Sequence, residues 1–193
     1  MEGSMGPVAG SSHHSIYFRM PGIKIISPMT PKEYSLAYED FMKNDDVMYV
    51  SEHRGSYLNK NELKDYLEDD LDLVLFPISI TRFEALKAKQ ELEKEGYKIG
   101  IANILWIKPF IIKKEWEIAV KNSKCGGIVL DDDYTQGVAS NLAYELMKKT
   151  EKKFEVMGLK DKSAGFSTST DNLPPSCKEI VIKAKEIINK KIK

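Results

Sequence analysis

The stretch Leu73-Val74-Leu75-Phe76 is followed after a short gap by Thr81-Arg82-Phe83-Glu84, and these two segments decide the fold class. Four consecutive apolar residues are typical of a strand that is buried on both faces of a sheet. The second segment has the spacing of a capping box, which marks the start of a helix. Behind it, Ala85, Ala88 and Leu92 recur on one stripe, as in a helix that packs on a sheet. A buried strand followed by an amphipathic helix is therefore predicted here.

The same alternation continues toward the carboxyl end of the chain. The last helix is predicted to begin at Ser176-Cys177-Lys178-Glu179, another capping-box pattern. Regular alternation of strands and helices predicts an α/β protein with a mostly parallel sheet and helices on both faces. Further strands are expected at residues 97–105, 127–130 and 154–157, and further helices at residues 114–122 and 136–149.

The amino-terminal part of the chain shows a shorter version of this pattern. Strands are expected at residues 23–26 and 47–50, on either side of a helix that begins at Thr30-Pro31-Lys32-Glu33. A polar connector follows the second strand. We therefore place a boundary between a first domain, residues 1–57, and a second domain, residues 58–193.

The composition argues against several classes of protein. The chain has 193 residues, with 29 Lys and Arg against 29 Asp and Glu, so its net charge is zero. A nucleic-acid-binding domain needs a cationic face, so no nucleic-acid partner is expected. No apolar run approaches the roughly 20 residues of a membrane span, and no signal peptide is recognised. Cys125 and Cys177 lack the spacing of a zinc site and are expected as thiols, so we predict a cytoplasmic protein.

Few side chains have the spacing of a catalytic motif, because the Gly-rich dinucleotide motif, the P-loop and the GxSxG motif are all absent. Asp131-Asp132-Asp133 follows a predicted buried strand, where carboxylates are able to hold magnesium. The alternative, which we favour, is that these acids precede a helix whose amino terminus attracts negative charge. His13 and His14 lie in a Gly/Ser-rich stretch. They are either surface residues or groups that meet a phosphate or a reacting carbonyl oxygen.

Several segments carry a resemblance to one family. Residues 21–31 (PGIKIISPMTP) are similar to a PGLKVVxPSTP stretch, and residues 50–57 (VSEHRGSY) to LEHKxLY. Residues 71–92 resemble a DVTIVxxGxxVxxALEAAxxL stretch, and residues 173–176 (LPPS) resemble YLPxxxxI. All of these belong to the beta subunits of thiamine-diphosphate-dependent 2-oxoacid dehydrogenases of the pyruvate or branched-chain type. The resemblance extends over roughly residues 7 to 190.

The resemblance implies a specific domain organisation. Residues 1–57 would be the end of a pyrimidine-binding domain, and residues 58–193 a transketolase carboxyl-terminal domain. In the family, the second domain is a three-layer α/β/α unit with a five-stranded, mostly parallel sheet. The glutamate that activates the aminopyrimidine in the family has no counterpart here, and the diphosphate-binding domain belongs to another subunit.

The resemblance also implies candidate site residues. Family members carry a Gly-rich stretch that ends in HSQ, and its histidine faces the thiamine and the substrate. His14 is the best match for this catalytic histidine, and His13 is its competitor. The family also binds potassium in the loop after the first helix. The residues at that place are Phe41, Met42, Asn44 and Asp46, for which a structural turn is the alternative.

The implied function is the oxidative decarboxylation of a 2-oxoacid within a complex. Thiamine diphosphate and magnesium would be bound mostly by other segments, with potassium as a further ligand. The expected partners are the alpha subunit, the dihydrolipoyl acyltransferase component and a second copy of the chain, and the isolated chain is expected to be inactive. One alternative is a non-catalytic assembly or binding module. Another is a transketolase-like enzyme that acts on sugar phosphates, for which Arg82 is a candidate phosphate ligand.

Overall fold

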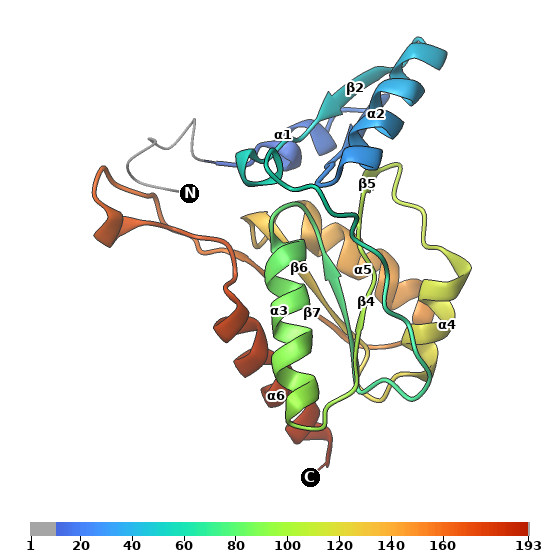
Figure 1. Ribbon diagram of the computed structural model, residues 1–193, viewed down its shortest axis with the longest axis vertical. Coiled ribbons are helices and arrows are strands. Elements are labelled where there is room, and N and C mark those ends of the chain that lie inside the picture. The colour runs from blue at the N-terminus through green and yellow to red at the C-terminus, as the bar shows by residue number, and fades with distance from the viewer. Residues whose placement is uncertain (1–10, 193) are drawn as a thin grey trace.

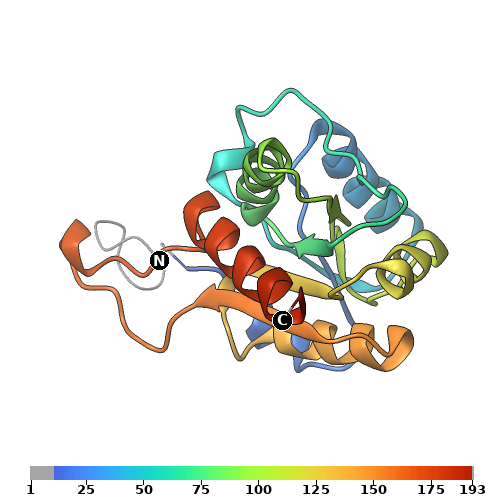
Figure 2. The ribbon, with the colours of Figure 1, turned by 90° about the horizontal axis from the view of Figure 1, so that it is seen from below.

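The computed structural model describes residues 11–192 and arranges them around two β-sheets (Figure 1). The larger sheet is parallel, with the strand order β4-β3-β6-β7. Its strands are β3 (Leu73–Pro77), β4 (Ile99–Ile101), β6 (Gly127–Tyr134) and β7 (Phe154–Leu159). The helices around it are α3 (Thr81–Lys94), α4 (Lys114–Asn122), α5 (Val138–Thr150) and α6 (Cys177–Ile192). Figure 2 shows α3 and α6 side by side, with the strands between them and α5.

Alternate residues of β3 explain why helices pack on both faces of this sheet. Leu73 and Leu75 belong to a core cluster that includes residues of α3 and α6. Val74 and Phe76 belong to a second cluster that includes residues of α4 and α5. All four side chains are fully buried. Because successive side chains of a strand point to opposite faces, a strand covered on both sides has to be apolar throughout. The predicted three-layer α/β/α fold is confirmed.

The parallel sheet has four strands in the part of the chain that the structure describes, where five were expected. The single strand predicted at residues 97–105 is wrong, because β4 is shorter and a separate strand, β5 (Trp106–Lys108), follows it. The regular ladder of β4 ends before Asn103, whose amide donates to the Asp65 carboxylate at 2.7 Å, although Ile104 still bridges to Ile78 beside β3. β5 then pairs antiparallel with β1 (Ile23–Ile26) in the smaller sheet.

The smaller sheet contains strands from both sides of the predicted domain boundary. β1 and β2 (Val47–Val50) come from the first predicted domain, and β5 comes from the second. The helix between β1 and β2 is α2 (Pro31–Lys43), and it begins as the sequence predicts. The Glu33 amide donates to Thr30 Oγ1 at 3.4 Å, and the Glu33 carboxylate accepts from the Met29 amide at 2.9 Å. The boundary near residue 58 stays a prediction.

Short helices complete the described chain: α1 (His14–Phe18) and the 3-10 helices η2 (Arg54–Ser56) and η3 (Thr168–Thr170). α1 contacts β1, β6 and α5. Cys125 and Cys177 form no disulfide. Among residues 11–192, we find no helix with the length and apolar character that a bilayer crossing requires.

Candidate functional site

The three aspartates Asp131, Asp132 and Asp133 lie inside β6, at the carboxyl end of the parallel sheet. The prediction that they follow the strand and lie at the amino terminus of a helix is therefore wrong, since β6 includes them and α5 begins only at Val138. At the amino end of α5, a backbone amide is paired with a serine and not with one of these aspartates: the Val138 amide donates to Ser15 Oγ at 3.0 Å. All three aspartates are buried, with 0%, 4% and 8% of their surface exposed. Carboxyl groups in such surroundings need partners, because burial of an unpaired charge is costly.

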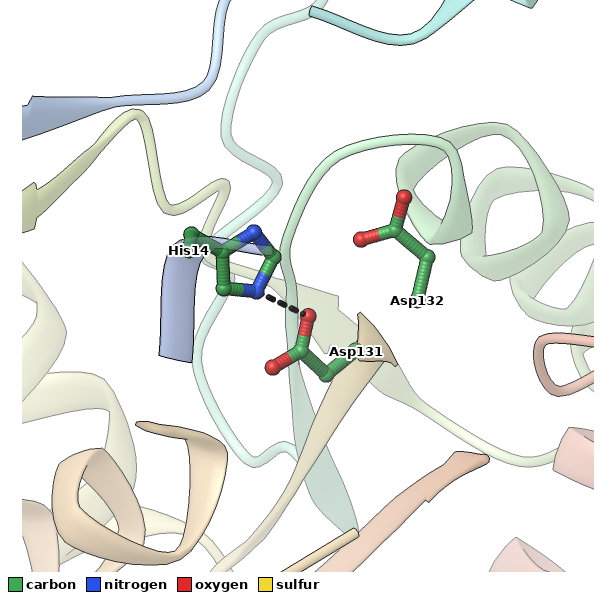
Figure 3. A group of neighbouring side chains, drawn as sticks. All are labelled: His14, Asp131 and Asp132. Atoms are coloured by element: carbon green, nitrogen blue, oxygen red, sulfur yellow. Dashed lines mark hydrogen bonds and ion pairs between the residues drawn. The ribbon is translucent and has the colours of Figure 1, made fainter. Parts of the chain in front are cut away.

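His14 supplies one of these partners from α1, and none of its surface is exposed. His14 Nε2 lies 3.0 Å from Asp131 Oδ1 (Figure 3). It also lies 3.7 Å from Asp133 Oδ2. His14 Nδ1 lies 3.1 Å from Ser51 Oγ, directly after β2. The next residue also joins the cluster, since the Ser15 amide donates to Asp133 Oδ2 at 3.0 Å. The imidazole is thus held between the two sheets.

The neighbouring carboxylates and the burial of the ring shift the pKa of His14 in opposite directions. Burial works to lower the pKa of His14, but the charge of Asp131 and its hydrogen bond work to raise it. Asp132 and Asp133 add to this attraction, so the pKa of His14 rises from 6.5 to about 9. Burial, with a contribution from Asp131, raises the pKa of Asp132, although His14 and a hydrogen bond from Ser79 oppose this shift.

The same side chains form a potential set of metal ligands. His14, Asp131 and Asp132 each offer one ligand atom, and these atoms all lie within 4.8 Å of one another. No other group of three such side chains meets this criterion among residues 11–192. The sequence predicted the aspartates and the histidine only as separate candidates, because 117 positions separate His14 from Asp131.

The other predicted site residues lie away from this cluster. His13 lines an open pocket beside it, with Asp133 and Tyr134. The four residues of the predicted potassium loop are exposed or paired with neighbours, and the potassium site stays a prediction. Phe41 and Met42 are 52% and 79% exposed, Asn44 Nδ2 donates to the Asp40 carbonyl at 2.8 Å, and Asp46 pairs with Lys24 at 2.9 Å.

Arg82, the candidate phosphate ligand, is 1% exposed and has protein partners on each nitrogen. Its Nη1 and Nη2 donate to the two Glu33 carboxylate oxygens at 2.7 Å each, and its Nε donates to Asn103 Oδ1 at 3.1 Å. Bidentate geometry of this kind gives the strongest side-chain ion pairs. The guanidinium is therefore committed to holding α2 against α3 and is not available to a phosphate.

Sequence reasoning missed two serines that complete the cluster. Ser51 follows β2, and Ser79, which follows β3, donates from Oγ to Asp132 Oδ2 at 2.8 Å. Each is a small polar residue just after an apolar strand, at the sheet edge where open α/β folds place functional groups. The place of each serine just after an apolar strand was the sequence feature that could have identified it.

Comparisons with known proteins agree with this fold. The family model described as "Transketolase, C-terminal domain" matches residues 65–180. The 2-oxoisovalerate dehydrogenase subunit beta of Bacillus subtilis (strain 168) is 25% identical over 151 residues, which cover 68% of this chain and 45% of that protein. A pyruvate dehydrogenase E1 component subunit beta of Staphylococcus epidermidis is 24% identical over 187 residues, covering 88% of this chain and 57% of that protein. The chain spans about half the length of these relatives.

Solved structures show the same fold at lower sequence identity. A split-gene transketolase, described as an inactive beta4 tetramer, superimposes with a TM-score of 0.69 at 13% identity, over 91% of this chain and 60% of its own. A transketolase from Pichia stipitis in complex with sedoheptulose 7-phosphate gives a TM-score of 0.68 at 14% identity, over 97% and 28%. The resemblance to 2-oxoacid dehydrogenase beta subunits, noted from sequence segments, is confirmed. The family model covers more than half of the chain, which therefore belongs to the transketolase carboxyl-terminal domain family.

Proposed function

We propose that the chain serves as the carboxyl-terminal part of the beta subunit of a 2-oxoacid dehydrogenase first component. The complex would decarboxylate a 2-oxoacid oxidatively, in the cytoplasm. Its relatives named as beta subunits match up to 95% of the chain, which supports this assignment. Residues 1–57 would then be the remnant of the pyrimidine-binding domain, and residues 58–193 the transketolase carboxyl-terminal domain.

The observation that carries the subunit role is an apolar surface on α2 and β2. Side chains there are large and apolar yet exposed, whereas the parallel sheet is covered by helices on both faces. Large exposed apolar side chains concentrated on one helix and the strand that follows it favour a surface that another chain covers. The residues are Leu36 (44% exposed), Tyr38 (62%), Phe41 (52%), Met42 (79%) and Val47 (65%). The alpha subunit is the proposed partner for this surface, and a second copy and the acyltransferase component are proposed for other faces.

The described residues do not fit the diphosphate end of thiamine diphosphate. The cluster at the end of β6 holds three buried carboxyl groups, which would repel a diphosphate. Thiamine diphosphate and its magnesium ion are therefore proposed to be held by other segments of the assembly. When bound there, the cofactor supplies the electron sink for decarboxylation. The contribution of this chain is to position and join subunits.

The geometry favours an anchoring role for His14 over direct contact with the substrate. Both ring nitrogens already have partners, Ser51 and Asp131, and the ring is fully buried. A catalytic His14 would have to leave this cluster when the partner subunit binds. This observation supports the assembly module as the second candidate function. The sugar-phosphate alternative loses its phosphate ligand, because Arg82 is paired with Glu33.

Reconstitution tests the proposal directly. The purified chain should release no carbon dioxide from pyruvate or branched-chain 2-oxoacids alone, and should co-purify with a cognate alpha subunit. Phe41→Glu should abolish co-purification, whereas Ile118→Glu, which changes an apolar residue 48% exposed on α4, should not. Turnover by the chain alone, or equal co-purification of both variants, would overturn the proposal.

A further experiment separates the two candidate functions. In a complex reconstituted with the missing beta segment, His14→Gln should leave turnover within about threefold of wild type if His14 only anchors α1. A loss of roughly a hundredfold, the usual scale for a general acid or base, would assign His14 to catalysis. Thermal unfolding of the same variant, measured in parallel, shows whether the complex is still folded.

A further inference from the structure

The cluster around His14 contains more negative than positive charge. One imidazole faces three carboxyl groups, those of Asp131, Asp132 and Asp133, and all four side chains are buried. Buried charges are normally paired or coordinate metal ions. Only His14 provides a cationic partner in the cluster, and its ring contacts Asp131 and Asp133 directly. The cluster therefore has more carboxyl groups than its one imidazole can neutralise.

Two carboxylate oxygens in this cluster have no hydrogen-bond partner. They are Asp131 Oδ2 and Asp132 Oδ1, and they are the only such buried side-chain atoms in the described part of the chain. About nine in ten buried polar groups in proteins are hydrogen-bonded, so adjacent exceptions call for a missing partner. Leaving a buried acceptor unsatisfied costs stability, because the group loses its water without gaining a partner. Both exceptions belong to residues whose ligand atoms lie within 4.8 Å of a ring nitrogen of His14.

We propose that His14 Nε2 and the carboxylates of Asp131 and Asp132 bind one divalent transition-metal cation of the Zn²⁺ or Mn²⁺ type. The three ligand atoms lie within 4.8 Å of one another (Figure 3). Two ligands bound about 2.1 Å from one ion are at most about 4.2 Å apart, so a small inward movement completes the site. An imidazole nitrogen beside carboxylate oxygens favours Zn²⁺ or Mn²⁺ over Mg²⁺ and Ca²⁺, which prefer oxygen ligands.

The residues around these ligands orient them for an ion. Nδ1–H of His14 donates to Ser51 Oγ in the metal-bound form, which directs the lone pair of Nε2 to the ion. Ser79 holds Asp132 Oδ2 and leaves Oδ1 free. Binding displaces the proton between Nε2 and Asp131 Oδ1, and this proton leaves to solvent.

An open pocket lies next to the proposed ligands and reaches their neighbour Asp133. The pocket has a volume of about 560 Å³ and is lined by Asp133 and Tyr134 of β6, together with Ser12 and His13. Because all the proposed ligands belong to this chain, the site does not rest on the proposed subunit role.

The test uses the full chain, freed of metal with EDTA and dialysed. Isothermal titration with ZnCl₂ and with MnCl₂ should show one ion per chain, and Mg²⁺ should bind at least tenfold more weakly. Asp132→Asn should weaken binding by at least about tenfold, and Ser51→Ala by roughly tenfold, as expected for a residue that orients a ligand. Two controls at the pocket, His13→Gln and Asp161→Asn, should change binding less than about twofold.

Two results would overturn the proposal. One is the absence of Zn²⁺ and Mn²⁺ binding at about 1 mM, the upper end of the range of dissociation constants of protein metal sites. The other is binding that Asp132→Asn leaves unchanged or that His13→Gln removes, which would place the ion on the surface. Electron paramagnetic resonance of Mn²⁺ gives an independent signal, because ions held by protein lose the sharp spectrum of the hydrated ion. Far-ultraviolet circular dichroism confirms that each variant is folded.

Discussion

Two buried ionic clusters hold the amino-terminal elements against the parallel sheet, and they differ in how their charges are matched. In the first, Arg82 pairs with Glu33, and Asn103 completes the hydrogen bonds of the guanidinium. In the second, His14 faces Asp131 together with its two acidic neighbours. The first cluster has one positive and one negative group, whereas the second has a surplus of carboxylates.

This difference separates a structural contact from a site that needs another ligand. A balanced pair with full hydrogen bonding requires nothing further, and removing one member leaves the other buried and unpaired. A cluster with surplus carboxylates has to take up a proton or a cation. We therefore expect substitutions in the two clusters to change stability in opposite directions.

The largest effect is expected for Arg82→Met. The variant leaves the Glu33 carboxylate without its bidentate partner, and breaking a buried pair in this way costs about 3–5 kcal/mol of unfolding free energy. Urea denaturation followed by circular dichroism measures this change. Lys87→Met, on the same helix, removes a pair with Glu84 that is largely exposed and should cost less than about 0.5 kcal/mol. A similar loss in both variants would show that burial does not distinguish the two pairs.

A smaller effect of opposite sign is expected for Asp132→Asn in EDTA. The amide has nearly the shape of the carboxyl group but removes one surplus charge, and the carbonyl oxygen keeps the hydrogen bond from Ser79. We expect the free energy of unfolding to rise by about 1 kcal/mol, the scale of one unsatisfied buried group. The urea midpoint at neutral pH measures the change. A loss of stability would mean that the cluster is balanced without a metal.

Another buried acid, Asp72, tests the balanced case at the opposite end of the parallel strands, directly before β3. Burial works to raise the pKa of Asp72, but hydrogen bonds from Lys124 Nζ and the Lys98 amide, with the charges of both lysines, outweigh it and lower the pKa below 3.8. A lowered pKa in the folded state gives stability that is present above the unfolded value and lost as the pH falls through the folded value.

Asp72→Asn should therefore cost about 1 kcal/mol at pH 7, and the difference from wild type should shrink as the pH falls below about 4. Urea unfolding at a series of pH values between neutrality and pH 3 gives this comparison. A difference that stays constant with pH would mean that Asp72 acts through packing and not through its charge.

The sequence predicted the fold well where each element carries its own signal. The apolar run at Leu73 and the capping box at Thr81 led to β3 and α3 with nearly correct bounds. It did not predict the separation of β5 from β4, because that depends on pairing with β1 and on the contact between Asn103 and Asp65. Both interactions join residues far apart in the chain, and neither leaves a local pattern.

The site was predicted only as separate pieces. His14 was found through a family resemblance, and the aspartates through their place after an apolar strand. Three consecutive acids before a predicted helix are typical of a helix start. The extension of the strand through these acids was therefore not predicted. The acids lie in β6 because His14 and the Ser15 amide neutralise and bond their carboxylates there. That contact is tertiary, and no pattern around residue 131 contains it.

The smallest effect is expected where the same imbalance of charge lies at the surface. Lys24 pairs with both Asp40 and Asp46, at 3.0 and 2.9 Å, so one cation again faces two carboxylates. The Asp46 side chain is 54% exposed, so water and salt compensate the surplus that a buried cluster has to balance internally. Lys24→Met should leave the free energy of unfolding nearly unchanged, and should change it even less in 1 M salt. Urea unfolding at low and high salt measures this. An effect as large as that of Asp132→Asn would show that the charge count alone, and not its burial, sets the cost, and the case for a cation at His14 would lose its physical basis.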